Sequence, residues 1–126
     1  MAKKKAPTTI FEVTDFFGNL VQLLPNTWTN HVMVEHPEMA AYQPLVQQTI
    51  VNPFEVCEST QYDFGAVFIS PPGSGPSPEG IRAVVWYQHW SYQKGAATGL
   101  VATAYPIDIV RYGNPKVGKT IYRKGK

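Results

Sequence analysis

The sequence IRAVVWYQH, residues 81–89, is the stretch that decides the fold. Five of its residues are consecutive and apolar or aromatic, from Ala83 to Tyr87. A short, nearly continuous apolar run of this kind is typical of a strand that is covered on both faces. We therefore expect residues 81–89 to form a central strand of a sheet.

Three further segments favour strands around this one. Residues 54–58, 62–70 and 99–106 are rich in β-branched and aromatic residues, and the last of them ends at a proline. The stretch 71–80 is dominated by Pro, Gly and Ser and predicts a loop between two strands. We predict an antiparallel meander of four strands, followed by an irregular or weakly extended basic tail over residues 115–126.

The first part of the chain combines a hairpin with helices. Residues 8–13 and 20–24 are β-rich and flank Gly18 and Asn19, which favour a turn. Residues 27–36 have helical spacing, and Pro37 ends that helix. A second helix is predicted from Pro37 to residue 52, in which Pro44 either introduces a kink or marks the true first turn. The fold class is thus α+β: an N-terminal β-hairpin and two helices packed on a four-stranded antiparallel sheet.

Length and composition suit one domain. The chain has 126 residues, of which 44% are hydrophobic and 16% charged, and this balance argues against intrinsic disorder. We assign residues 8–122 to a single domain and residues 1–7 and 123–126 to basic tails. The lone cysteine, Cys57, cannot form a disulfide within the chain, which favours a cytoplasmic location. No apolar run approaches the roughly 20 residues that span a bilayer, so we expect no membrane partner.

Charge is distributed unevenly along the chain. Residues 6–79 contain eight acidic residues and no Lys or Arg, whereas residues 80–126 contain eight basic residues and one acid. This polarity can place a basic face on the C-terminal strands, which would suit a polyanion. Mutual attraction between the two halves of the domain explains the same pattern equally well.

Two histidines are the main candidates for catalysis. His31 lies on the first predicted helix and His36 at its end, so both can reach the same rim of the sheet. Because an unperturbed imidazole titrates near pH 6.5, two of them can supply a general base and a general acid to one phosphodiester. In RNA, the adjacent 2′-hydroxyl would be the nucleophile, and no metal or other cofactor is needed. The alternative is that His31 occupies a polar helix face and His36 caps the helix.

Other side chains can support or replace this chemistry. Thr103 and Tyr105 alternate on the last predicted strand and share one face, where they either donate hydrogen bonds or merely fill the sheet surface. The available cations are Arg82, Arg111 and Lys119, and four aromatic residues can stack on unpaired bases: Trp86, Tyr87, Trp90 and Tyr92. Core packing is the simpler explanation for Trp86. A zinc site built from the three histidines (His31, His36 and His89) and Cys57 is not favoured, since neither a His-Glu-x-x-His nor a C-x-x-C spacing is present.

Several segments together resemble a known family. The resemblance runs from about Val13 to Tyr122, and its most specific part is a His-containing helix followed by His-Pro-Glu and a later Asn-Pro. The segments that carry it are VTDFFGNLV (13–21), WTNHV (28–32), EHPEM (35–39), TIVNPFEV (49–56) and VATAYP (101–106). They are similar to the phage-associated Barnase, EndoU, colicin and RelE-like nuclease domains, the PBECR group.

The resemblance implies a helical unit on a four-stranded antiparallel sheet and a metal-independent ribonuclease activity. Carried over by position, His31 and His36 match the helix histidines, and Thr103 and Tyr105 match the C-terminal strand motif. We therefore expect an endoribonuclease, toxin-like or phage-derived, with these four catalytic residues, no metal and no cofactor. Trp28, Arg82, Arg111 and Lys119 are assigned to substrate binding. RNA and a cognate inhibitor protein are the expected partners; the alternative is a non-catalytic accessory module of the same fold that binds nucleic acid or protein.

Overall fold

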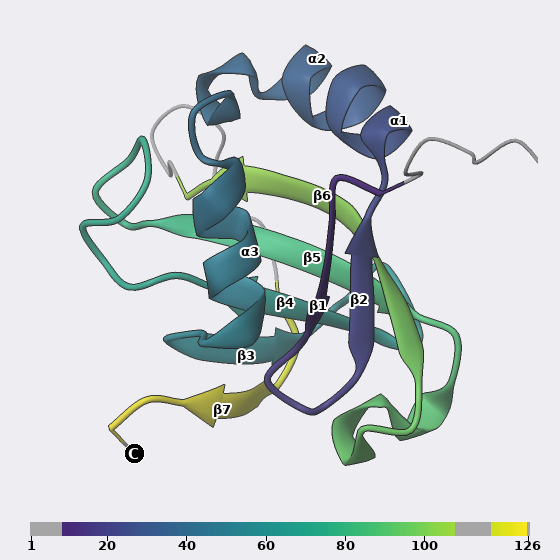
Figure 1. Cartoon of the computed structure of the whole chain (residues 1–126). Helices are drawn as coiled ribbons and strands as arrows, with labels where there is room; N and C mark the ends of the chain where they lie inside the picture. The colour runs from purple at the N-terminus through teal and green to yellow at the C-terminus, as the bar shows by residue number, and fades with distance from the viewer. Residues whose placement is uncertain (1–8, 108–116, 126) are drawn as a thin grey trace, which may run out of the picture.

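The domain is built on one mixed sheet of seven strands. The structure is a computed structural model that describes residues 9–107 and 117–125 (Figure 1). In sheet order β1-β2-β6-β5-β4-β3-β7, every neighbouring pair is antiparallel except β2 and β6, which are parallel. The strands are β1 (Phe11–Thr14), β2 (Leu20–Leu23), β3 (Glu55–Glu58), β4 (Gly65–Ile69), β5 (Ile81–Tyr87), β6 (Thr98–Pro106) and β7 (Thr120–Arg123).

The α+β class is confirmed, but the prediction of a four-stranded sheet is wrong. The predicted meander forms only the middle of the sheet, as β3, β4, β5 and β6. The N-terminal hairpin extends it through the pairing of Leu20 with Thr98 and of Gln22 with Leu100. On the other side β7 pairs with β3, in a region predicted to be a tail, and the predicted boundary after Tyr122 cuts through this strand. Both additions depend on pairing between distant segments, which local sequence patterns do not encode.

The first predicted helix is present and begins two residues earlier than predicted, whereas the second is shorter than predicted. The first is a continuous helical stretch made of α1 (Pro25–Thr27), the π-helical turn η1 (Trp28–Val32) and α2 (Met33–Glu35). The second prediction, a helix from residue 37 to 52, is wrong in its first half. The only helical element of that half is the 3-10 turn η2 (Pro37–Met39). The α-helix α3 follows and spans Gln43–Val51, with Pro44 in its first turn. Proline is accepted there because the first N–H groups of a helix have no intrahelical partner.

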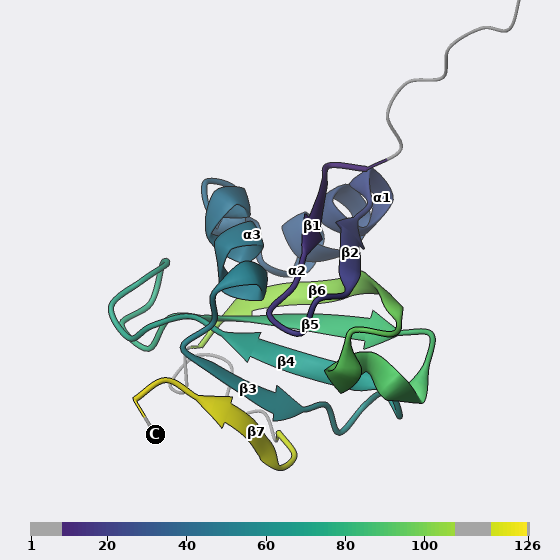
Figure 2. The same ribbon diagram turned by 60° about the horizontal axis from the view of Figure 1, so that its bottom comes forward.

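The main core lies between the sheet and the segments that cover one of its faces. Helix α3, the hairpin β1-β2 and the first helical stretch all lie on the same side of β3-β4-β5-β6 (Figure 2). Alternate residues of the central strands point into this core, among them Phe68 of β4 and Ala83 and Val85 of β5. Trp86 of β5 points the other way and is 39% exposed, because the same alternation places it with Arg82 and Val84 on the opposite face.

A buried carboxylate ties the β1-β2 turn to the sheet. Asp15 is 5% exposed, and its Oδ1 accepts hydrogen bonds of 2.8 Å from the backbone N–H groups of Phe17 and Asn19. The hydroxyl of Tyr87, on β5, donates to Asp15 Oδ2. The Asn19 side chain donates to the carbonyl oxygen of Tyr92 at 2.6 Å, in the 3-10 turn η3 (Trp90–Lys94). Asp15 and Asn19 therefore join the β1-β2 turn to β5 and to η3, which follow it by more than 70 residues in the chain.

We expect the free energy of unfolding to decrease above about pH 10 because of Tyr87. Burial, and then the neighbouring Asp15 carboxylate, raise the pKa of this hydroxyl far above its usual value of 10.0. Above that pH the unfolded chain loses the proton while the folded chain keeps it, so rising pH favours unfolding. Relative to that of Tyr87→Phe, the free energy of unfolding of the wild type should fall by about 1.4 kcal/mol per pH unit. Urea unfolding of both proteins across this range measures the effect, and a constant difference between them would contradict it.

Candidate functional site

A cavity of about 630 Å³ opens on the face of the sheet opposite α3. Its floor is formed by Val67 of β4 and Val84 of β5, with Thr103 and Tyr105 of β6. One wall carries His31, Glu35 and His36, and the other is the loop over residues 59–62. The four residues expected to be catalytic, His31, His36, Thr103 and Tyr105, thus line the same cavity.

A β-bulge directs the two β6 side chains into the cavity. Val84 pairs with Thr103, whereas Val85 pairs with Val101, so β6 has one extra residue at this point. The extra residue changes which side chains face each side of the sheet after it. As a result Val101 and Ala104 both pack in the core, while Thr103 and Tyr105 face the cavity.

The histidine wall is held against the edge of β6. Strand β2 pairs only with the first residues of β6, from Thr98 to Leu100. Beyond them, η1 and η2 pack against β6. Val32 of η1 and Met39 of η2 are fully buried and fix this stretch to the core, which leaves His31 and His36 at the cavity rim. His31 lies in the π-helical turn, a feature that is frequent at functional sites.

Each histidine has a defined neighbour. The His36 ring contacts the Tyr105 ring, with centroids 5.7 Å apart and planes inclined by 37°. His31 Nε2 lies 3.7 Å from Glu35 Oε1, one helical turn further along, and forms an ion pair when His31 is protonated. Glu35 was not among the predicted site residues, although its position four residues after His31 is a signal for a side-chain pair.

The opposite wall is a tight turn that sequence reasoning also missed. Ser59 Oγ accepts hydrogen bonds from the backbone N–H groups of Gln61 and Tyr62, at 3.1 and 3.2 Å. Gly65 follows at the start of β4, where an added Cβ would lie 2.8 Å from the Cβ atoms of both Ser59 and Tyr62. The close approach of these chain segments therefore requires glycine. No motif in residues 59–62 indicated this role.

Of the four residues assigned to substrate binding, those that the structure describes do not line the cavity. Trp28 is 8% exposed and belongs to the main core. Arg82 is buried on β5 directly across from Tyr105, so its backbone adjoins the cavity floor although its side chain is not part of the lining. Lys119 is exposed beside β7, on the far side of the sheet order from β6. Arg111 lies outside the described residues.

The remaining candidate ligands and nucleophiles lie elsewhere. His89 caps η3, where its Nδ1 accepts a 3.1 Å hydrogen bond from the Ser91 N–H. Cys57 is buried, and burial is the main reason why the pKa of its thiol is raised, so the unreactive protonated form is favoured. Within residues 9–107 and 117–125, no group of three His, Cys, Asp or Glu side chains is arranged to hold a metal ion.

Comparisons with known proteins do not assign the chain to a family. No family model matches the sequence, and the searches of curated proteins and of solved structures give no significant match. In the part of the chain that the structure describes, no helix has both the length and the apolar character needed to cross a membrane.

Proposed function

We propose that this domain is a metal-independent endoribonuclease that cleaves RNA in the cavity that His31, Glu35 and His36 border on the face of the sheet opposite α3. The observation that supports the proposal is the convergence of two imidazoles and two hydroxyls on one open cavity, from a helical stretch and from β6. This set contains the groups required for proton transfer and for donation to a charged transition state. The resemblance to the PBECR group is consistent with the same activity.

In the proposed reaction, the RNA itself supplies the nucleophile. One imidazole removes the proton of the ribose 2′-hydroxyl as its oxygen forms a bond to phosphorus. The bond from phosphorus to the 5′-oxygen breaks, and the second imidazole gives its proton to that oxygen. The products are a 2′,3′-cyclic phosphate and a free 5′-hydroxyl. Thr103 and Tyr105 would donate hydrogen bonds to the non-bridging oxygens as negative charge accumulates on them.

The neighbours of the two histidines support an assignment of the general acid and the general base. Glu35 forms an ion pair only with protonated His31, so we assign to His31 the role of general acid, which must hold a proton before the reaction. His36 is half-buried and contacts the Tyr105 ring, which orients it over the floor of the cavity. We assign to His36 the role of general base. Glu35 is a positioning residue for His31 and does not take part in proton transfer.

One observation favours the accessory-module alternative. The lining of the cavity among the described residues contains the carboxylate of Glu35 but no Lys or Arg. A strongly basic lining is the usual way to attract a polyanion. Under this alternative the cavity binds a partner without cleaving it, and an inhibitor protein would have no activity to suppress.

The deciding experiment is RNA cleavage in the presence of excess chelator. We expect the purified full chain to cleave single-stranded RNA in EDTA and to leave 2′,3′-cyclic phosphate ends, which end-group analysis detects. An RNA that carries a single 2′-deoxy substitution should resist cleavage at that position. Cleavage that appears only when a metal is added would overturn the mechanism, and no cleavage under any condition would favour the accessory module.

A further inference from the structure

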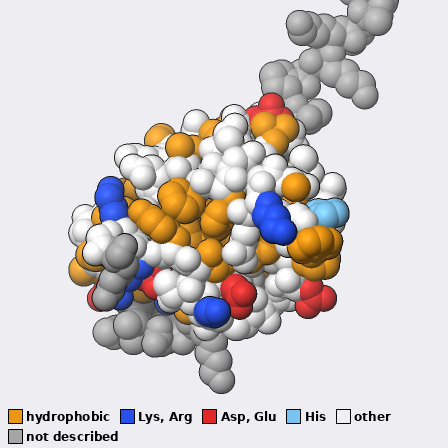
Figure 3. All heavy atoms as spheres, turned by 90° about the horizontal axis from the view of Figure 1, so that it is seen from below, with side chains coloured by type: hydrophobic (Ala, Val, Ile, Leu, Met, Phe, Trp, Pro, Cys, Tyr) orange, Lys and Arg blue, Asp and Glu red, His pale blue; other side chains and the backbone are white. Residues whose placement is uncertain are grey.

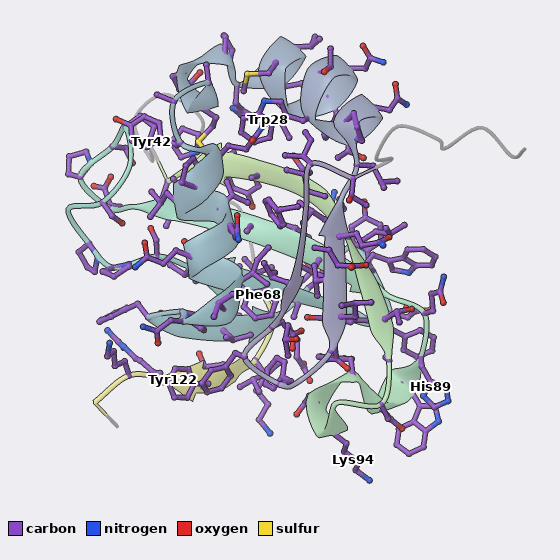
Figure 4. The ribbon with its side chains drawn as sticks, viewed as in Figure 1. Trp28, Tyr42, Phe68, His89, Lys94 and Tyr122 are labelled. Carbon is purple, nitrogen blue, oxygen red and sulfur yellow. The ribbon has the colours of Figure 1, made fainter. Side chains whose placement is uncertain are left out.

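A large aromatic side chain is exposed on the turn between β5 and β6. Trp90, the first residue of η3, is 63% exposed. The His89 ring is stacked beside it, with centroids 5.7 Å apart, and Lys94 Nζ lies 5.3 Å from the Trp90 ring centroid. Figure 4 shows that His89 and Lys94 both project outward from this end of the molecule. Tryptophan is enriched at binding interfaces, so this exposed ring is a candidate contact for a ligand.

Trp90 differs from the other aromatic residues that were considered for base stacking. Tyr87 and Tyr92 are stacked on each other in the core, with centroids 4.7 Å apart and planes inclined by only 9°. Both rings are also buried, so they offer a ligand little ring surface. Trp86 is less exposed than Trp90, at 39%. Among these four candidates, Trp90 has the most ring surface available to a ligand.

A second hollow lies between the turn that carries Trp90 and the 59–62 loop of the candidate site. This smaller cavity, of about 250 Å³, is lined by Tyr92 of η3 and by residues of the turn after β3. It shares Ser59, Thr60 and Tyr62 with the main cavity. The two cavities therefore adjoin the same 59–62 loop, and the second of them reaches η3 at Tyr92. We infer that a strand leaving the main cavity passes over this loop toward η3, which carries Trp90.

The charge of this surface is mixed. The second cavity suits a base better than a phosphate, whereas Lys94 of η3 suits a phosphate. The second cavity is lined by the carboxylates of Glu58 and Asp63, which repel phosphate and accept hydrogen bonds from base amino groups. Seen from below, apolar side chains are exposed, with both basic and acidic side chains among them (Figure 3). Lys94 is exposed and flexible, so its ammonium can move from the indole face to a backbone phosphate.

We propose that Trp90, with His89, is a stacking platform for an unpaired base of the single-stranded RNA whose cleavage site occupies the main cavity, and that Lys94 contacts the adjacent phosphate. This inference rests on the proposed function for the identity of its ligand. Base stacking on an aromatic ring is tolerant of sequence because every base presents a π face. The platform therefore increases the affinity for the strand and fixes the direction in which the strand leaves the main cavity. It adds little sequence preference.

The test measures binding apart from cleavage. A short 2′-O-methylated oligouridine, which has no free 2′-hydroxyl to attack the phosphorus, and an abasic strand of the same length are titrated against the full chain. Trp90→Ala should weaken oligouridine binding by about ten- to a hundredfold and leave the abasic strand unaffected. Trp90→Phe should retain most of the affinity. Lys94→Gln should weaken both strands and reduce the salt dependence of binding, because it removes a phosphate contact.

The control and the outcomes separate this inference from the proposed function. Val51→Ala, at an exposed apolar position at the end of α3, should bind both strands as the wild type does. If Trp90→Ala binds oligouridine as tightly as the wild type, or the wild type binds no oligouridine, the platform is wrong even if RNA is cleaved. If Trp90→Ala loses binding but the wild type never cleaves RNA, the platform stands and the catalytic proposal fails.

Discussion

His36→Ala is expected to slow RNA cleavage by about a hundred- to ten-thousandfold, the usual contribution of a general base. The variant loses the imidazole that contacts Tyr105 over the cavity floor, while Thr103, Tyr105 and His31 remain. His31→Ala should cause a loss of similar size, and the double variant should lose much less than the product of the two, because acid and base act in one step. Initial rates on a defined single-stranded RNA in EDTA measure these losses.

The matched control for both variants is His89→Asn. His89 is the third histidine, lies on the η3 turn and lines neither cavity, and asparagine retains an acceptor for the Ser91 N–H. Its kcat at saturating RNA should equal that of the wild type, because the platform that His89 shares with Trp90 contributes to RNA affinity and takes no part in proton transfer. Added imidazole should partly restore His36→Ala, which a purely structural role would not permit. If all three histidine variants cleave at the wild-type rate, the catalytic assignment is wrong.

The shape of the pH profile gives a second readout of the two roles. A base and an acid acting together predict a bell-shaped dependence of kcat/KM on pH. His36→Ala should lose the acidic limb of the bell and His31→Ala the alkaline limb, according to the roles assigned above. The opposite result would exchange the two roles while leaving the shared cavity as the site.

The parts of the fold that were predicted correctly are those with strong local signals. The apolar run of residues 81–89 identified β5, and the proline of the last predicted strand identified the end of β6 at Pro106. Strand β7 could not be recognised because its residues are half-buried or exposed and lack an alternating pattern. The parallel pairing of β2 with β6 was likewise invisible, since parallel neighbours are joined by long connections that reveal no partner.

The four residues that line the cavity were chosen from the sequence by their side-chain chemistry, but the geometry that brings them together was not predictable. His31 and His36 are separated from Thr103 and Tyr105 by more than 60 residues, and only the packing of η1 and η2 on β6 brings them together. The bulge that directs Thr103 into the cavity is a property of pairing with β5. Trp28 was assigned to the wrong environment because an aromatic residue on a helix fits a core and a binding surface equally well.

The largest expected effect on stability comes from Asp15→Ala, which should lower the free energy of unfolding by about 3–5 kcal/mol. The buried carboxylate accepts hydrogen bonds from two backbone N–H groups and from the Tyr87 hydroxyl, and alanine would leave all of these donors without an acceptor. Asp15→Asn retains one acceptor oxygen and should lose less. Urea unfolding at neutral pH measures both variants.

The control for Asp15→Ala is the exposed acid on the preceding strand. Glu12 accepts a 2.7 Å hydrogen bond from the Gln22 side chain at the protein surface, so Glu12→Ala should change stability by no more than about 0.5 kcal/mol. Asp15 lines neither cavity, so the fraction of Asp15→Ala that remains folded should cleave RNA at the wild-type rate. A loss no larger than that of Glu12→Ala would show that the β1-β2 turn holds its place without the buried charge. In that case the attachment of the hairpin would depend on the parallel pairing of β2 with β6 and on the burial of Val21 and Leu23.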